Sequence, residues 1–140
     1  MHKLKAVLGA LAVTGAAILA NPGTSAAVDG ALSATSPDGG AYGSVYADFT
    51  SPFYVNINSI YINDRCPGDG VRAVIRFHVR YNGDAHFTQV GSREDAGGCE
   101  SDPYRGATHW GPTNRKINDF GITVCSTNCS GMTYRDNPHN

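Results

Sequence analysis

The chain has 140 residues, of which 11 are Lys or Arg and 12 are Asp or Glu, and its formal net charge at pH 7 is −1. Because the composition has no excess of positive charge, a nucleic-acid partner is disfavoured. The length suits a single domain with one hydrophobic core.

The first 27 residues have the composition of a secretory signal peptide. Lys3 and Lys5 give a basic start, residues 6–20 are almost entirely apolar or small, and the small residues 25–27 offer a cleavage site. A membrane anchor is disfavoured, because this run of about 15 residues is shorter than the roughly 20 that span a bilayer. We expect residues 1–27 to be removed and the mature protein to be secreted, without insertion into a membrane.

The rest of the chain is expected to form one β domain. Residues 28–42 are rich in small residues without any period, which predicts a flexible leader, and residues 136–140 are predicted to be a polar tail. Residues 43–135 contain alternating apolar residues and frequent turn signals, but no helical period. The predicted fold class is all-β: a small antiparallel β-sandwich, immunoglobulin-like or crystallin-like, with two disulfides.

Alternation of apolar residues locates the strands in chain order. The first covers residues 43–50 and the second covers residues 52–64, where the apolar phase changes near Asn58 and Ser59. Such a change predicts either a β-bulge or a strand that crosses from one sheet to the other. Further strands are predicted within residues 71–81, 84–90, 107–110, 119–125 and 132–135.

The clearest alternation is VRAVIRFHVRY at residues 71–81, which predicts a strand with one apolar and one mostly basic face. Asn82 and Gly83 follow it and predict a hairpin. A three-residue loop of residues 81–83 keeps the phenylalanines of both strands on the core face, and this decides the register. The predicted pairs are Arg80 with Asp84, His78 with His86, and Phe77 with Phe87.

The basic face of this strand is the candidate ligand-binding site, with the residues Arg72, Arg76, His78 and Arg80, together with His86 from the next strand. Arginines without an acidic partner would bind carboxylate, phosphate or sulfate groups through their planar guanidinium groups. The alternative is a solvated face of mixed charge, as antiparallel sheets commonly show. Acidic side chains of the following loop could reach back to Arg72 or Arg76: Glu94, Asp95, Glu100 and Asp102.

Two facing histidines also raise the question of a metal site. The sequence places no third ligand beside His78 and His86, and the neighbouring arginines disfavour a cation. We therefore expect no metal or other cofactor.

The four cysteines are expected to form two disulfides, because export leads to an oxidising compartment. Three pairings are possible. Cys125 and Cys129 are favoured as one pair because the sequence CSTNC permits a tight turn, which leaves Cys66 to pair with Cys99. A structural zinc site is less favoured, since it usually needs two closely spaced pairs and this chain has one.

No catalytic motif is legible in the chain: it has no G-x-S-x-G, P-loop, dinucleotide-binding or EF-hand pattern. The Ala-rich export signal, the use of Arg over Lys, the Gly-rich β body and the closing VC…C segment resemble small secreted proteins of actinobacteria, most of them uncharacterised. The resemblance covers the layout of the chain and implies secretion, and it carries no catalytic residues.

Three hypotheses of function follow from the sequence. The leading one is an extracellular binding module for an anionic or carbohydrate ligand, such as a cell-wall or other anionic polysaccharide, or for an extracellular protein. The second is a secreted inhibitor or toxin-like domain that acts through residues 92–106, braced by Cys99. The third is a small hydrolase, whose carboxylate spacing the sequence does not give.

Overall fold

The computed structural model of the chain describes residues 29–66, 70–99 and 101–140. The predicted signal peptide, residues 1–27, lies outside the described residues. The strands are β1 (Gly30–Thr35), β2 (Ala41–Ser51), β3 (Tyr54–Asp64), β4 (Val74–Tyr81), β5 (Thr88–Glu94), β6 (Tyr104–Trp110), β7 (Ile117–Cys125) and β8 (Thr133–Asp136).

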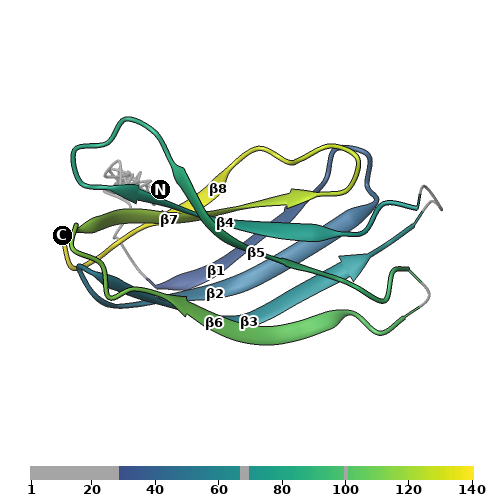
Figure 1. Ribbon diagram of the computed structural model, residues 1–140, viewed down its shortest axis with the longest axis horizontal. Helices are drawn as coiled ribbons and strands as arrows, with labels where there is room; N and C mark the ends of the chain where they lie inside the picture. Colours follow the sequence, from purple (N-terminus) through teal and green to yellow (C-terminus); the bar gives the residue numbers. More distant parts are fainter. Residues whose placement is uncertain (1–28, 67–69, 100) are drawn as a thin grey trace, which may run out of the picture.

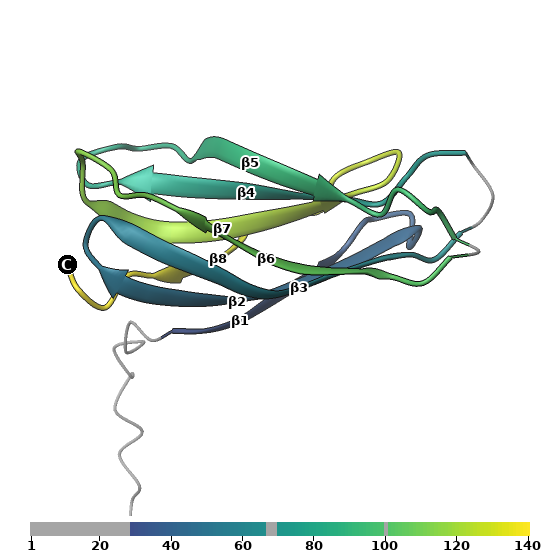
Figure 2. The same ribbon diagram turned by 60° about the horizontal axis from the view of Figure 1, so that its bottom comes forward.

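The strands form two four-stranded antiparallel sheets that pack face to face (Figures 1 and 2). Sheet A has the order β1-β2-β3-β6, and sheet B has the order β5-β4-β7-β8. The pairing of β3 with β6 and of β4 with β7 corresponds to the central strand pairs of immunoglobulin-like sandwiches. The predicted fold class, an all-β antiparallel sandwich, is therefore confirmed.

Alternating side chains of both sheets build the core between them. The sheets approach closely at Gly43, where an added Cβ would lie 2.9 Å from Val124 Cγ2 and 3.2 Å from Ile75 Cδ1. Only a residue without a side chain fits there. The largest core side chains are Phe49, Phe77, Phe120, Ile57, Ile60, Ile62, Ile75, Ile117 and Ile122.

The phase change in the second predicted strand is a β-bulge within β3. The register between β3 and β6 shifts between Ile57 and Ile60, and Ser59 has a φ of 50°. β3 stays paired with β2 and β6 on both sides of the shift, so it does not cross between the sheets. The extra residue changes the parity of the apolar positions while keeping them on the core face.

Both ends of the described chain belong to the sandwich. In place of a flexible leader, the structure has β1, which pairs with β2 and buries Leu32. In place of a free tail, Asn137 is buried and its Nδ2 donates to the Ser51 and Ile117 carbonyls at 3.1 and 3.0 Å. Neither element was predicted from the pattern of apolar residues. Strand β1 has only one large apolar residue, Leu32, and the C-terminal segment is held by polar contacts of Asn137 with the backbone.

The turn between β4 and β5 is the predicted one. The Asp84 amide donates to the Tyr81 carbonyl at 3.0 Å, and Gly83 has a φ of 86°, which glycine adopts without strain. Asn82 and Gly83 therefore form the tight turn that their sequence predicts.

The predicted register of this hairpin, however, is wrong. β5 begins only at Thr88, and His78 pairs with Gln89. Residues 84–87 leave the ladder, and the Phe87 ring packs against Tyr134 of β8 on the outer face of sheet B, with ring centroids 5.4 Å apart. The predicted pairs of Arg80 with Asp84, His78 with His86, and Phe77 with Phe87 do not form.

Both predicted disulfides, Cys66–Cys99 and Cys125–Cys129, are present. Cys66 follows β3 and Cys125 ends β7, so both bonds lie at the same end of the sandwich (Figure 1). Two disulfides in so small a domain indicate an oxidising environment, as extracellular proteins have. Within the described ranges, no helix has the length and apolar character needed to cross a bilayer.

Candidate functional site

Strand β4 turns three of the predicted site residues away from the core. We call Arg76, His78 and Arg80 the arginine face. Their chain neighbours fill the space between the sheets, so the period of two directs these three side chains to the outer surface of sheet B, as the alternation predicts. The buried neighbours are Ile75, Phe77 and Val79.

Two of the predicted arginines are paired with carboxylates. Arg72 Nη1 lies 3.0 Å from Glu94 Oε1, and both side chains are more than half exposed, at 56% and 52%, so this ion pair contributes little to stability. Arg80 Nε donates to Asp119 Oδ2 at 2.6 Å, and the Asp119 side chain is 0% exposed. The partner of Arg80 thus comes from β7 rather than from the hairpin.

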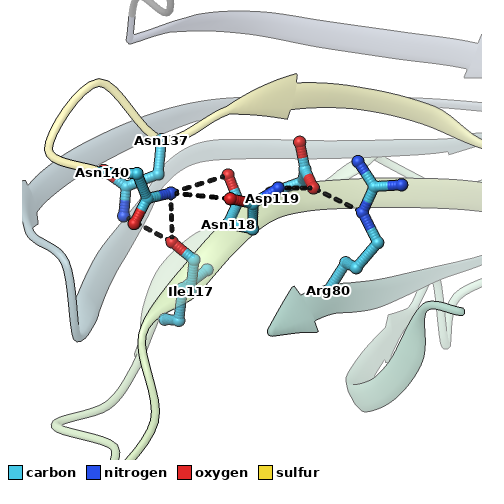
Figure 3. A network of polar contacts seen from close by, with 6 residues as sticks. All are labelled: Arg80, Ile117, Asn118, Asp119, Asn137 and Asn140. Atoms are coloured by element: carbon cyan, nitrogen blue, oxygen red, sulfur yellow. Dashed lines mark hydrogen bonds and ion pairs between the residues drawn. The ribbon is translucent and has the colours of Figure 1, made fainter. Parts of the chain in front are cut away.

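Arg80 is also held by aromatic rings and by a polar network. Its guanidinium lies over the Phe87 and Tyr134 rings, 5.3 and 5.9 Å from their centroids. Figure 3 shows the polar network that its carboxylate partner, Asp119, belongs to. Asn118 Nδ2 donates to Asp119 Oδ2 at 3.1 Å, and from Asn118 the network extends towards the C-terminal residues. These contacts give Arg80 a structural role.

A second carboxyl group completes this network. Asp136 of β8 is the cross-strand partner of Asp119. Hydrogen bonding to the Asp119 carboxylate, burial and the Asp119 charge raise the pKa of Asp136. Asp119 Oδ1 is buried and has no hydrogen-bond partner within the described residues.

The remaining residues of the predicted site are less constrained. Arg76 is exposed, and no described carboxylate pairs with it. His78 Nε2 lies 3.1 Å from Thr123 Oγ1, within hydrogen-bond distance. His86 is exposed in the segment 84–87, and the strand partner of His78 is Gln89. The structure therefore brings Arg76 and His78 together and leaves His86 outside their strand pair.

We predict that His78 makes the fold less stable in acid. Burial, and then the charge of Arg76, lower the pKa of His78 below its usual value. As the pH falls below about 6.5, the unfolded chain takes up a proton that the folded chain does not, so the free energy of unfolding decreases. Denaturant unfolding between pH 8 and 5 should show His78→Gln gaining stability relative to the wild type as the pH falls. A constant difference would contradict this.

The outer face of sheet A carries a second cluster of arginines, which the sequence did not predict. Tyr42 of β2 and Tyr61 of β3 lie between buried core positions, so both rings point outward, and their centroids are 6.0 Å apart in an edge-to-face arrangement. Arg65 follows β3, and Arg105 of β6 is the register partner of Tyr61. We call these four residues the tyrosine–arginine platform.

The two guanidinium groups of the platform rest on its rings. Arg65 Cζ lies 4.7 Å from the Tyr42 ring centroid, and Arg105 Cζ lies 4.9 Å from that of Tyr61. Both arginines are exposed, and neither pairs with a carboxylate of the described chain. Their hydrogen-bond donors are thus oriented by stacking and remain available to an anion.

Polar groups without charge surround the platform. In the register of sheet A, Ser33, Ser44, Tyr61 and Arg105 form one row across all four strands. Asn63 lies beside Tyr42. The cluster was missed because its members come from separate parts of the chain. The excess of tyrosine over phenylalanine, 7 to 5, did indicate that some aromatic side chains lie at the surface with solvent-exposed hydroxyls.

The Cys66–Cys99 disulfide and the loop after β5 have structural roles. Asp64, Cys66 and Cys99 are close enough to suggest a metal site, but the two sulfurs are bonded to each other and offer no thiolate ligand. The loop after β5 is anchored by this disulfide and by buried Asp95, whose Oδ2 accepts a hydrogen bond from the Asp64 amide at 3.2 Å.

The chain matches no protein-family model, no curated protein sequence and no solved structure. The assignment of the candidate site therefore depends only on the contacts and distances within this structure.

Proposed function

We propose that this protein is a secreted binding module that holds an anionic polysaccharide on the tyrosine–arginine platform. The observation that carries the proposal is the stacking of Arg65 and Arg105 on two neighbouring tyrosines without a carboxylate partner in the described chain. Export agrees with the two disulfides and with the predicted signal peptide.

The chemistry of the platform suits a charged sugar chain. The apolar face of a pyranose ring packs on a tyrosine ring, while the fork of a guanidinium binds a carboxylate or sulfate with two hydrogen bonds. Ser44 and Asn63 offer hydroxyl and amide groups to sugar hydroxyls beside the rings. One platform thus supplies the three contacts that an acidic sugar needs.

The shape of the platform favours a polymer over a small molecule. Its residues stand on the outer surface of a four-stranded sheet, and a small ligand is usually held in a concave pocket instead. A chain that lies along the sheet can place successive acidic groups on Arg65 and Arg105, so two weak contacts reinforce each other.

Replacing Arg65 and Arg105 together with Ala is expected to weaken binding to alginate, a polyuronate, by about ten-fold or more, because two charge-assisted contacts are lost. Co-sedimentation with alginate beads and with bacterial cell-wall material at low and high salt measures this. Binding by the wild type should fall at high salt and be absent on neutral dextran.

The matched control is the double variant Arg72→Ala, Arg76→Ala, which removes the same charge from sheet B. We expect this control to bind like the wild type. If the control loses binding and the platform variant retains it, the ligand binds at Arg72 and Arg76 instead. If the wild type does not bind either material, the polysaccharide proposal is wrong.

The second candidate function is a secreted inhibitor or toxin-like domain that acts through residues 92–106. It is favoured by the Cys66–Cys99 bond and by the hydrogen bond from the Asp64 amide to buried Asp95, which tie these two residues of the loop to the end of β3. Such an activity should appear as inhibition of a secreted proteinase or of bacterial growth, and it should be lost when the Cys66–Cys99 bond is removed.

A further inference from the structure

The sandwich is open along one side, between the edge strands β5 and β6. These strands end sheets B and A on the side opposite β1 and β8. Their inward positions are only half-buried, among them Val90 in β5 and Thr108 and Trp110 in β6. Figure 1 shows the two strands as the edges of their sheets.

A cavity of about 190 Å³ lies at this opening. Its walls include Ile57 and Phe77, which are 1% and 2% exposed and belong to the core, together with Val90 and Trp110 from the edges. An engineered cavity of about 150 Å³ in another protein holds benzene. The cavity between β5 and β6 is therefore large enough for one aromatic ring or a short branched alkyl group.

Arg93 is the charged residue that lines this cavity. Its Nη2 donates to Thr108 Oγ1 at 3.2 Å and its Nη1 donates to the Ser92 carbonyl at 2.8 Å. Both acceptors are uncharged, and Arg93 forms no ion pair with a described carboxylate. The guanidinium is thus fixed beside an apolar cavity with donors left for an anion.

From these observations we infer that the cleft between β5 and β6 binds a small monocarboxylic acid. The ring or branched alkyl group enters between Phe77 and Trp110, and the carboxylate meets Arg93. This site is separate from the tyrosine–arginine platform and does not depend on the proposed polysaccharide ligand.

Trp110 gives a direct measurement, because it is the single tryptophan of the sequence. Its Nε1 donates to the Tyr81 hydroxyl at 3.2 Å, which holds the indole in place. Titration with phenylacetate or isovalerate should shift the indole N–H signal in NMR spectra and change tryptophan emission in a saturable way. Toluene, which lacks the carboxylate, should bind more weakly.

Two variants and one control test the geometry. Arg93→Gln keeps a donor near Thr108 but removes the charge, and it should weaken phenylacetate binding by about ten-fold or more. Gly91→Val places a side chain in the cleft, where a Cβ would meet only Phe77 Cδ2 at 3.5 Å, so the variant should fold and lose binding. Arg76→Gln removes the same charge from the outer surface and should bind like the wild type.

The inference is overturned if saturating phenylacetate and isovalerate leave the Trp110 signals unchanged. It is also overturned if Arg93→Gln binds phenylacetate as tightly as the wild type, or if folded Gly91→Val retains full affinity. If the wild type binds phenylacetate but neither alginate nor cell-wall material, the polysaccharide proposal alone is rejected.

Discussion

Replacing Arg80 with Met is expected to lower the free energy of unfolding by about 3 kcal/mol or more. The change leaves the Asp119 carboxylate, whose side chain is 0% exposed, without its cationic partner. Stacking of the Arg80 guanidinium on Phe87 and Tyr134 is lost as well. Urea unfolding at pH 7, followed by circular dichroism, measures the effect.

The matched control is Arg115→Met. Arg115 Nη2 and Asp84 Oδ1 are also 2.6 Å apart, but their side chains are 49% and 33% exposed. Water replaces such a pair at small cost, so the control should lose about 1 kcal/mol or less. Equal losses in the two variants would show that burial of Asp119 does not decide the cost. A further Asp119→Leu change in the Arg80→Met background should recover much of the stability, since it removes the buried charge.

Removing the Cys66–Cys99 bond by replacing both cysteines with Ala should destabilise the protein by about 3 to 4 kcal/mol. The two cysteines are 33 residues apart, and a bond that closes so long a loop restricts the unfolded chain strongly. The bond also ties the segment after β3 to the loop after β5, and these segments belong to different sheets. Thermal and urea unfolding under oxidising conditions measure the loss.

Removal of the Cys125–Cys129 bond provides the comparison. These cysteines are only 4 residues apart, and the same loop-closure relation gives about 2 kcal/mol. The order of the two losses is the test. A larger loss for the Cys125–Cys129 variant would mean that native contacts around β7, rather than the unfolded chain, set the contribution of each disulfide.

The faces of the strands followed directly from the sequence. In β4, alternate residues from Ile75 to Val79 are buried and Arg76 is exposed, as the period of two requires for any extended chain that covers a core. The Asn82-Gly83 turn was also predictable, because it depends on the backbone preferences of two adjacent residues.

The register of the β4–β5 hairpin was not predictable from that turn. Pairing Phe77 with Phe87 satisfied the hairpin taken alone, whereas in the structure Phe87 contacts Tyr134 of β8. A register that is consistent for two strands taken alone therefore differs from the observed one when a side chain also contacts a further strand. Strand β1 was missed for a related reason, since Leu32 is buried only by the assembled sandwich.

In the candidate site too, the sequence predicted the positions of arginines on a strand but not their partners. Arginines in alternation along residues 71–81 led to the arginine face, but Arg80 is paired with a residue 39 positions away in the chain. Arg65 and Arg105, by contrast, have rings as partners and no acid in the described chain. Local sequence does not distinguish these two cases.

By itself, the sequence determined the all-β class and which side of a strand meets the core, and it favoured the correct one of three cysteine pairings. Those features depend on the period of an extended chain and on short-range geometry. Only the tertiary structure decided which arginines meet a carboxylate, which rest on tyrosines, and that β5 and β6 leave a cavity with Arg93 at its side. These contacts join strands distant in the chain, so they exist only once both sheets have packed.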